Sequence, residues 1–211
     1  MPTVPKVPTV PKVPTVLTES TELVQGVFSA TIDAHQRFAA QGVASVVAAV
    51  EAISRATAGG RKVLAFGNGG SAGDAQHFVT ELVGRFEHQR RAIPAVALTA
   101  DSSVLTAVAN DYGYEHVFTR QIEALGQAGD VCLGISTSGR SRNVEHAMLA
   151  ARRLGLVTIA LTGRDGGGVA AHGDIVVNVA EDSTARVQEV HRTILHAICL
   201  LVERSLTEHL P

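Results

Sequence analysis

After residue 60 the chain alternates between short apolar segments and segments with helical spacing, and this alternation strongly constrains its fold. Short apolar strands separated by helices are typical of a parallel sheet that is covered on both faces. We therefore predict an α/β fold, a three-layer αβα sandwich around a five-stranded parallel sheet of the flavodoxin-like or Rossmann-like kind. The expected strands lie at about 62–67, 94–98, 130–135, 156–161 and 174–179, and the expected helices at about 71–86, 102–109, 114–125, 141–154, 167–171 and 183–208.

Two different segments precede this alternation. Residues 2–16 repeat Pro-Thr-Val-Pro-Lys-Val with a proline at every third position, a pattern that disfavours helix and central strand and favours an extended polyproline II conformation. We expect a disordered proline-rich tail over 1–17 and a single domain over 18–211. Between residues 20 and 58 the apolar residues recur with helical spacing. This segment is expected to form one long or two consecutive N-terminal helices that could pack against another subunit.

The composition narrows the class of protein. The chain has 211 residues, of which 45% are hydrophobic and only 4% aromatic, and a net charge of −2. It shows neither the basic balance of a nucleic-acid-binding protein nor an apolar run of roughly 18 residues that could span a bilayer. We expect a cytoplasmic protein that binds neither nucleic acid nor membrane. Cys132 and Cys199 lie in apolar segments and are expected to be buried thiols.

A glycine-rich turn follows the first expected strand. Asn68, Gly69, Gly70 and Ser71 lie where the chain passes from strand to helix. Backbone N–H groups and the positive end of the helix dipole meet at such a turn and favour an anion. The alternative is a tight strand-to-helix turn with no ligand. The spacing Gly67-x-Gly69-x-x-Ala72, with Asp101 near the end of the next strand, also leaves a dinucleotide site open.

Two further polar loops follow strands and are expected at the same edge of the sheet. Ser136, Thr137, Ser138 and Ser141 place four hydroxyl groups at the start of a helix, and the segment 162–168 is rich in glycine. Ligands of parallel sheets bind beyond the carboxyl ends of the strands. Two anion-binding turns in one sheet predict a small molecule that carries a phosphate.

Candidate acid–base or metal-binding side chains lie on two expected helices. His77 and Glu81 are four residues apart, so they share a helix face and could bind one metal ion or act on one substrate. In the last helix Gln188, His191 and His196 interrupt an apolar pattern. Spacing does not distinguish a functional pair from a buried core histidine in that helix.

Five segments, in order along the chain, resemble the sugar-isomerase (SIS) domain family. They cover roughly residues 20–208 and read GNGGSAGDAQHFVTELVGRF, LTAVANDYGYEHVF, GDVCLGISTSGRSRNV, ALTGRDGGGVA and ARVQEVHRTILHAI. Within the family they are similar to enzymes that isomerise D-sedoheptulose 7-phosphate to D-glycero-D-manno-heptose 7-phosphate. The resemblance implies such an aldose–ketose isomerase, with a sugar-phosphate substrate and one Zn²⁺ per subunit. It also implies a homotetramer with active sites at subunit interfaces.

The resemblance also implies roles for individual residues. Glu81 and His196 match the acid–base pair, and the zinc ligands would be His77, Glu81, Gln188 and His196. The substrate-binding positions would be Asn68, Gly69, Gly70, Ser71, Glu81, Asn110, Asp111, Ser136, Thr137, Ser138, Ser141 and Gln188.

A related adaptor in the same family binds the bacterial replication initiator protein and is the alternative function. The carboxylate at Glu81 and the imidazole at His196 favour an enzyme over that adaptor, because proton transfer requires both groups. A sugar-phosphate-sensing regulator would be expected to carry a DNA-binding domain, and we expect none in this chain. The chain departs from the family at Arg140, where members often carry Asn, and this affects the expected phosphate loop.

Overall fold

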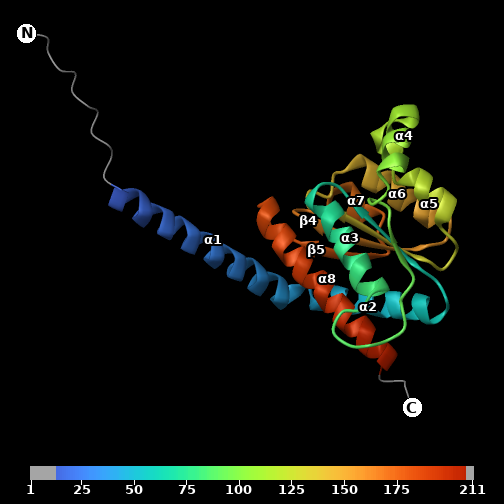
Figure 1. Cartoon of the computed structure of the whole chain (residues 1–211), viewed down its shortest axis with the longest axis horizontal. Helices are drawn as coiled ribbons and strands as arrows, with labels where there is room; N and C mark the ends of the chain where they lie inside the picture. The colour runs from blue at the N-terminus through green and yellow to red at the C-terminus, as the bar shows by residue number, and fades with distance from the viewer. Residues whose placement is uncertain (1–12, 208–211) are drawn as a thin grey trace, which may run out of the picture.

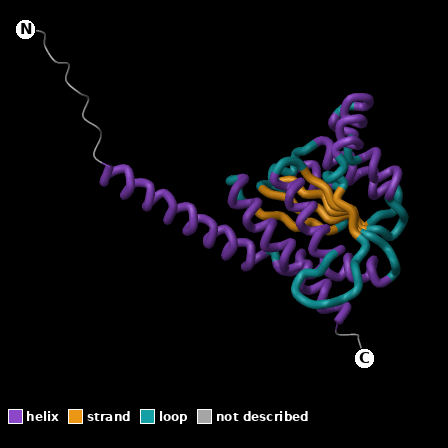
Figure 2. Tube along the Cα trace, viewed as in Figure 1, coloured by secondary structure: helices purple, strands orange, loops and turns teal. Residues whose placement is uncertain are grey.

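The computed structural model describes residues 13–207, with side chains for 19–206, and has the predicted α/β architecture. Five parallel strands lie in the order β2-β1-β3-β4-β5, between two layers of helices (Figures 1 and 2). The strands are β1 (Val63–Gly67), β2 (Ala95–Ala97), β3 (Val131–Ser136), β4 (Val157–Gly163) and β5 (Ile175–Val179). The helices are α1 (Val13–Gln41), α2 (Val43–Ala58), α3 (Gly70–Val83), α4 (Ser102–Tyr112), the 3₁₀ helix η1 (Tyr114–His116), α5 (Thr119–Leu125), α6 (Arg142–Arg153), α7 (Gly167–Ala171) and α8 (Thr184–Thr207).

The three central strands, β1, β3 and β4, are buried on both faces, because successive side chains point to opposite layers. In β1, Val63 and Ala65 belong to the hydrophobic core shared with α2, α3 and α8. Leu64 and Phe66 belong to the second core, which is shared with α5, α6 and α7. This arrangement explains the continuous apolar runs in the sequence.

The boundary between tail and domain differs from the prediction. Helix α1 begins at Val13, within the segment expected to be extended. Pro14 falls in the first helical turn, where a backbone N–H has no partner within the helix, so proline is tolerated there. The repeat in residues 1–12 lies outside the described residues, and the prediction for it stays a prediction.

Helix α1 docks on α8 through its second half and extends away from the body of the molecule through its first half (Figure 1). Thr31 donates a hydrogen bond to a Glu189 carboxylate oxygen at 2.8 Å, and His35 Nε2 lies 2.8 Å from Thr193 Oγ1. Helix α1 also carries an apolar face that is largely exposed to solvent. This face comprises Leu23, Val24, Val27, Phe28 and Ile32.

Helix α8 packs along the sheet through a long apolar stripe and one buried histidine. His191 is fully buried, and its Nε2 lies 2.9 Å from the carbonyl oxygen of Thr162 at the end of β4. Burial lowers the pKa of His191 to about 4. Of the two possibilities left open by the sequence, His191 is therefore a core histidine that is neutral at neutral pH.

We predict a pH-dependent loss of stability from His191. An unfolded histidine titrates near 6.5, and the folded pKa is lower, so between about pH 6.5 and 4 the unfolded state binds more protons and stability falls with falling pH. From pH 7 to pH 5 the parent should lose about 2 kcal/mol more unfolding free energy than His191→Gln. Urea unfolding at both pH values measures this difference. An identical pH dependence in parent and variant would contradict the assignment.

Candidate functional site

The first two loops meet beyond the carboxyl ends of β1 and β3, where the strand order reverses and α/β sheets bind ligands. Asn68 and Asn143 exchange two amide hydrogen bonds, each 2.9 Å long, and so join the loop after β1 to the first turn of α6. The Tyr114 hydroxyl donates to Asn68 Oδ1 at 3.1 Å. The position of Asn68 is therefore fixed from two sides.

The second loop gathers hydroxyl groups as predicted. Ser136 Oγ lies 3.0 Å from Ser141 Oγ and 3.5 Å from Ser138 Oγ. Gly139 has φ +64°, and a Cβ there would lie 2.1 Å from the carbonyl oxygen of Gly166. The loop therefore packs directly on the third loop, and the N–H of Val169 in α7 donates to the Gly139 carbonyl at 3.0 Å. This contact leaves a compact group of hydroxyls at the N-terminus of α6, a suitable site for a phosphate.

Arg140 extends from this loop and forms an ion pair. Its Nη2 lies 2.6 Å from Asp165 Oδ2 on the third loop. Both side chains are exposed, so the pair contributes little to stability. Arg140 therefore ties the second and third loops together at the rim.

The glycines of the first loop bring the backbone close to α8. Gly69 has φ +55°, a conformation that favours glycine. A Cβ on Gly70 would lie 2.1 Å from the amide nitrogen of Gln188, so a larger residue at position 70 would displace the end of that side chain. Gln188 therefore reaches the first loop from α8.

Below the loops, α3 and α8 run side by side and face each other with polar residues. Arg192 Nη2 lies 2.5 Å from Asp74 Oδ1, and this carboxylate is nearly fully buried. Burial raises the pKa of Asp74, and the adjacent Arg192 cation partly offsets that effect. This ion pair joins the two helices just beyond the loops.

His77, Glu81 and His196 form a further polar group between α3 and α8, which we call the acid–base group. The two imidazole Nε2 atoms lie 2.8 Å apart, so one ring donates its N–H to the other, and Glu81 Oε1 lies 3.5 Å from His77 Nε2. Burial and the Arg192 cation lower the pKa of His77. The group holds a carboxylate beside two imidazoles that can exchange protons, as general acid–base catalysis requires.

The loops and the acid–base group are separate within one chain. Glu81 lies ten residues after Ser71 along α3, a rise of roughly 15 Å. His196 lies eight residues after Gln188 along α8, a rise of roughly 12 Å. The structure therefore places the predicted site residues in two clusters on the same pair of helices.

The four implied zinc ligands are also split between the two clusters. His77, Glu81 and His196 gather, and imidazole and carboxylate are ordinary zinc donors. Two nitrogens bound to one Zn²⁺ would stand about 3.3 Å apart for bonds of about 2.0–2.1 Å, somewhat more than the 2.8 Å found. Among the described residues, no group of three or more His, Cys, Asp or Glu side chains is arranged to hold a metal ion, and Gln188 lies against Gly70. The donor chemistry of the three clustered residues fits zinc.

Asn110 and Asp111 contact each other, since the Asn110 amide donates to Asp111 Oδ1 at 2.8 Å. They are exposed near the end of α4, which buries none of its residues and projects from the body (Figure 1). Asp101 accepts the N–H groups of Ser103 and Val104 at 2.9 and 3.0 Å, so it caps α4. Because the Asp101 carboxylate already accepts these two N–H groups, it is less available to bind a ribose, which weakens the dinucleotide alternative.

Three residues that organise the site were not predicted. Asn143 and Tyr114 each contact Asn68, and Arg192 contacts Asp74. Polar residues in the first turn of a helix, such as Asn143, are a detectable signal. The other two contacts join residues 46 and 118 positions apart in the sequence, and no local pattern marks them.

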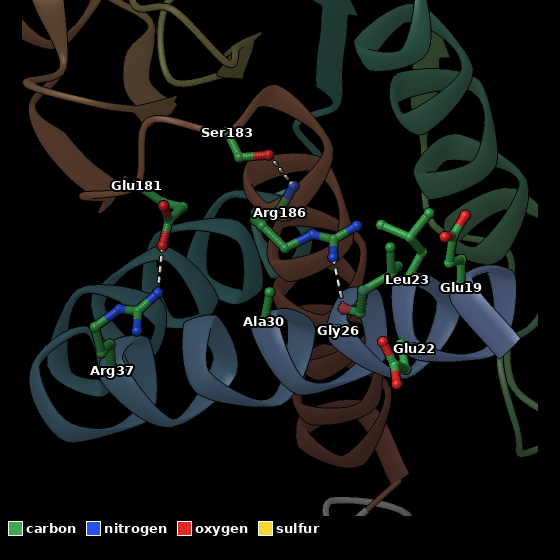
Figure 3. A pocket seen from close by; sticks show the side chains of 10 residues that line it. Glu19, Glu22, Leu23, Gly26, Ala30, Arg37, Glu181, Ser183 and Arg186 are labelled. Carbon is green, nitrogen blue, oxygen red and sulfur yellow. Dashed lines mark hydrogen bonds and ion pairs between the residues drawn. The ribbon is translucent and has the colours of Figure 1, made fainter.

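A cavity of about 780 Å³ lies between α1 and the start of α8 (Figure 3). Arg186 extends into it from α8 and donates to the Val27 carbonyl of α1 at 2.7 Å. The cavity contains none of the predicted site residues. Its lining comprises Glu19, Glu22, Leu23, Gly26, Val27, Ala30, Arg37, Glu181, Ser183 and Arg186. We assign the candidate site to the loops and the acid–base group, because the chemistry-bearing residues converge there.

None of the helices in the described part of the chain is long and apolar enough to cross a membrane.

Comparison with known proteins agrees with the observed fold. The SIS domain family matches residues 28–163. Phosphoheptose isomerase of Geotalea daltonii is 56% identical over 161 residues, which are 76% of this chain and 84% of the relative.

Solved structures give the same result. The phosphoheptose isomerase of Neisseria gonorrhoeae superposes with a TM-score of 0.83 at 46% identity, covering 87% of this chain and 98% of that one. The enzyme from Francisella tularensis superposes with a TM-score of 0.85 at 37% identity, covering 88% and 98%. The chain therefore belongs to the SIS domain family, in which these near relatives are phosphoheptose isomerases.

Proposed function

We propose that this chain is a phosphoheptose isomerase that converts D-sedoheptulose 7-phosphate to D-glycero-D-manno-heptose 7-phosphate. The observation that carries the proposal is the pairing of a carboxylate and an imidazole, Glu81 and His196, through His77 on the facing helices α3 and α8. An aldose–ketose isomerisation needs one base at carbon and one acid at oxygen. The group supplies both.

The proton transfers follow from the two groups. The Glu81 carboxylate takes a proton from C1 of the ketose, while His196 donates a proton to the carbonyl oxygen at C2, giving an enediol. Glu81 then returns its proton to C2, and the hydroxyl at C1 gives its proton to His196 as the aldehyde forms. Both catalytic groups end in their starting states, and no hydride acceptor is needed.

The hydroxyl-rich loop is suited to the phosphate of this substrate. Ser136, Ser138 and Ser141 direct hydroxyls to the N-terminus of α6, where the helix dipole favours an anion. Asn68, held by Asn143 and Tyr114, offers a polar contact beside it. The phosphate end and the reacting end of the substrate thus have separate binding groups.

We predict that Glu81→Gln and His196→Ala each lower kcat by about 10²–10⁴-fold, the usual contribution of a positioned base or acid. Substrate binding should largely persist, because the loops are unchanged. Steady-state kinetics with purified protein and sedoheptulose 7-phosphate measures both effects. Glu123→Gln, an exposed carboxylate on α5, serves as the control and should retain the parent kcat.

The same experiment separates the enzyme from the adaptor. If Glu81→Gln and His196→Ala stay within a factor of about three of the parent, well short of the expected range, the acid–base assignment is wrong. A parent protein with no isomerase activity that binds the bacterial replication initiator would favour the adaptor.

The enzyme is a homotetramer in which neighbouring copies complete each active site. One observation supports this. The exposed apolar face of α1 includes Leu23 at 72% and Phe28 at 66% exposure, and such a face is unusual for a helix that remains in water.

We predict that replacing Leu23 and Phe28 together by Glu reduces the assembled mass and the activity in parallel, because two charges oppose burial of the α1 face. Light scattering combined with kinetics measures both quantities. Leu125→Glu, at an exposed leucine on α5, is the control and should change neither. A parent that runs as a monomer with full activity would refute the assembly.

Zinc is the cofactor proposed, with His77, Glu81 and His196 as ligands from the acid–base group. The resemblance adds Gln188 as a fourth ligand, but in this structure its side chain lies against Gly70, away from the other three. When bound, Zn²⁺ would polarise substrate oxygens as a Lewis acid. Gln188 is a weak amide donor that lies against Gly70, so affinity should be modest and part of the metal can be lost during purification.

We predict that added zinc raises the melting temperature of the parent, because the metal binds only the folded ligand set. Metal analysis and thermal unfolding with and without zinc test this without reference to activity. His77→Ala should abolish both the bound metal and the shift. His116→Ala is the control, because His116 contacts another imidazole, that of His146, outside the site. Equal metal content in the two variants would exclude the proposed ligands.

A further inference from the structure

The segment that follows α3 is anchored to α8 by one buried carboxylate. Glu203 is fully buried, and it accepts backbone N–H groups from three consecutive residues. Phe86 N–H donates to Oε2 at 3.0 Å, while the N–H groups of Glu87 and His88 donate to Oε1 at 2.9 and 2.6 Å. This carboxylate therefore fixes the path of residues 86–88 directly after the helix that carries Glu81.

Arg90 lies beside this carboxylate and caps the end of α3. Its side chain is only 2% exposed, and its Nε lies 3.3 Å from Glu203 Oε2. Its guanidinium donates to the carbonyl oxygens of Glu81, Leu82 and Gly84 at 2.6, 2.9 and 3.2 Å. These carbonyls belong to the last turn of a helix and its end, where partners within the helix are missing. Arg90 thus holds the backbone of Glu81 itself.

The same segment also contacts His196. The Phe86 ring lies 5.6 Å from the His196 ring, centroid to centroid, with 34° between the planes. Glu203 lies seven residues after His196, two turns further along the same side of α8. The Glu203 contact with the Phe86 backbone therefore sets where this ring stands against the imidazole.

We propose that Arg90 and Glu203 are positioning residues that set the relative placement of Glu81 and His196 for the isomerase reaction. The inference rests on the proposed function and adds two residues that touch neither substrate nor reacting atoms. A buried ion pair is a costly way to gain stability, since apolar residues of similar size often do as well. Capping α3 and ordering residues 86–88 needs a cation and an anion at these two places.

Glu203→Gln tests the proposal. The amide keeps one acceptor but presents an NH₂ group to N–H donors, so the segment should shift. Small misplacements of catalytic groups reduce rates strongly, and we expect kcat to fall by about 10- to 100-fold with KM within about two-fold of the parent. Arg90→Lys keeps the charge beside Glu203 but loses the fork of carbonyl contacts. It should lower kcat by a smaller factor than Glu203→Gln, again with little change in KM.

Asp130→Asn is the matched control. Asp130 is also a buried carboxylate that accepts backbone N–H groups, from Lys62 and Gln127 at 3.0 and 2.9 Å, and pairs with Lys62 Nζ at 2.5 Å. It lies just before β3, at the opposite edge of the sheet from the loops. The two variants should lose comparable thermal stability, whereas only Glu203→Gln should lose kcat.

A second measurement does not depend on activity. NMR should show faster amide hydrogen exchange at residues 86–88 and a weakened Phe86–His196 ring contact in Glu203→Gln, but not in Asp130→Asn. If Glu203→Gln and Arg90→Lys both keep the parent kcat, or if Asp130→Asn loses as much kcat as Glu203→Gln, the proposal is wrong. A parent without isomerase activity would instead refute the proposed function, and unchanged exchange and ring contacts in Glu203→Gln would then also refute the positioning role.

Discussion

Packing of α8 against the sheet and against α3 is the interaction on which the rest of the structure depends. Its apolar stripe is buried from Val187 to Val202, and each fully buried aliphatic side chain contributes about 1.5–3 kcal/mol. His191 lies within that stripe and bonds to the end of β4. Because this packing fixes the rotation of α8 about its axis, it also fixes which residues of α8 face α3. The polar contacts between the helices are a consequence of the apolar ones.

Those polar contacts succeed each other along the two helices. In order along the helices, the Gln188 side chain lies against Gly70, Arg192 forms an ion pair with Asp74, and the His196 ring contacts the His77 ring. Burial of the carboxyl and the imidazole raises the pKa of Asp74 and lowers that of His77. A purely apolar interface would pack the helices with less desolvation. The chain instead keeps titratable groups between two helices, where their separation is held by the surrounding core.

The predicted binding groups lie in different parts of the subunit. The hydroxyl-rich loop lies at the carboxyl edge of the sheet, whereas the acid–base group lies two to three turns down α3 and α8. Helix α4, with Asn110 and Asp111, and the first half of α1 project from the body (Figure 1). These projecting elements carry exposed polar and apolar residues that a neighbouring copy would cover in the proposed tetramer.

The sequence by itself determined the strand and helix order, the parallel sheet, the hydroxyl-rich loop and the two helices that carry candidate catalytic groups. These features depend on local periodicity and on residues close together in the chain. Only the tertiary structure decided that His191 is a core residue while His196 meets His77, since that choice depends on the rotation of α8. It likewise decided that Gln188 reaches Gly70, that Asp101 caps a helix, and that Arg90 and Glu203 join α3 to α8. Such contacts form between residues far apart in the sequence, and their partners are set by packing, which leaves no periodic pattern in the chain.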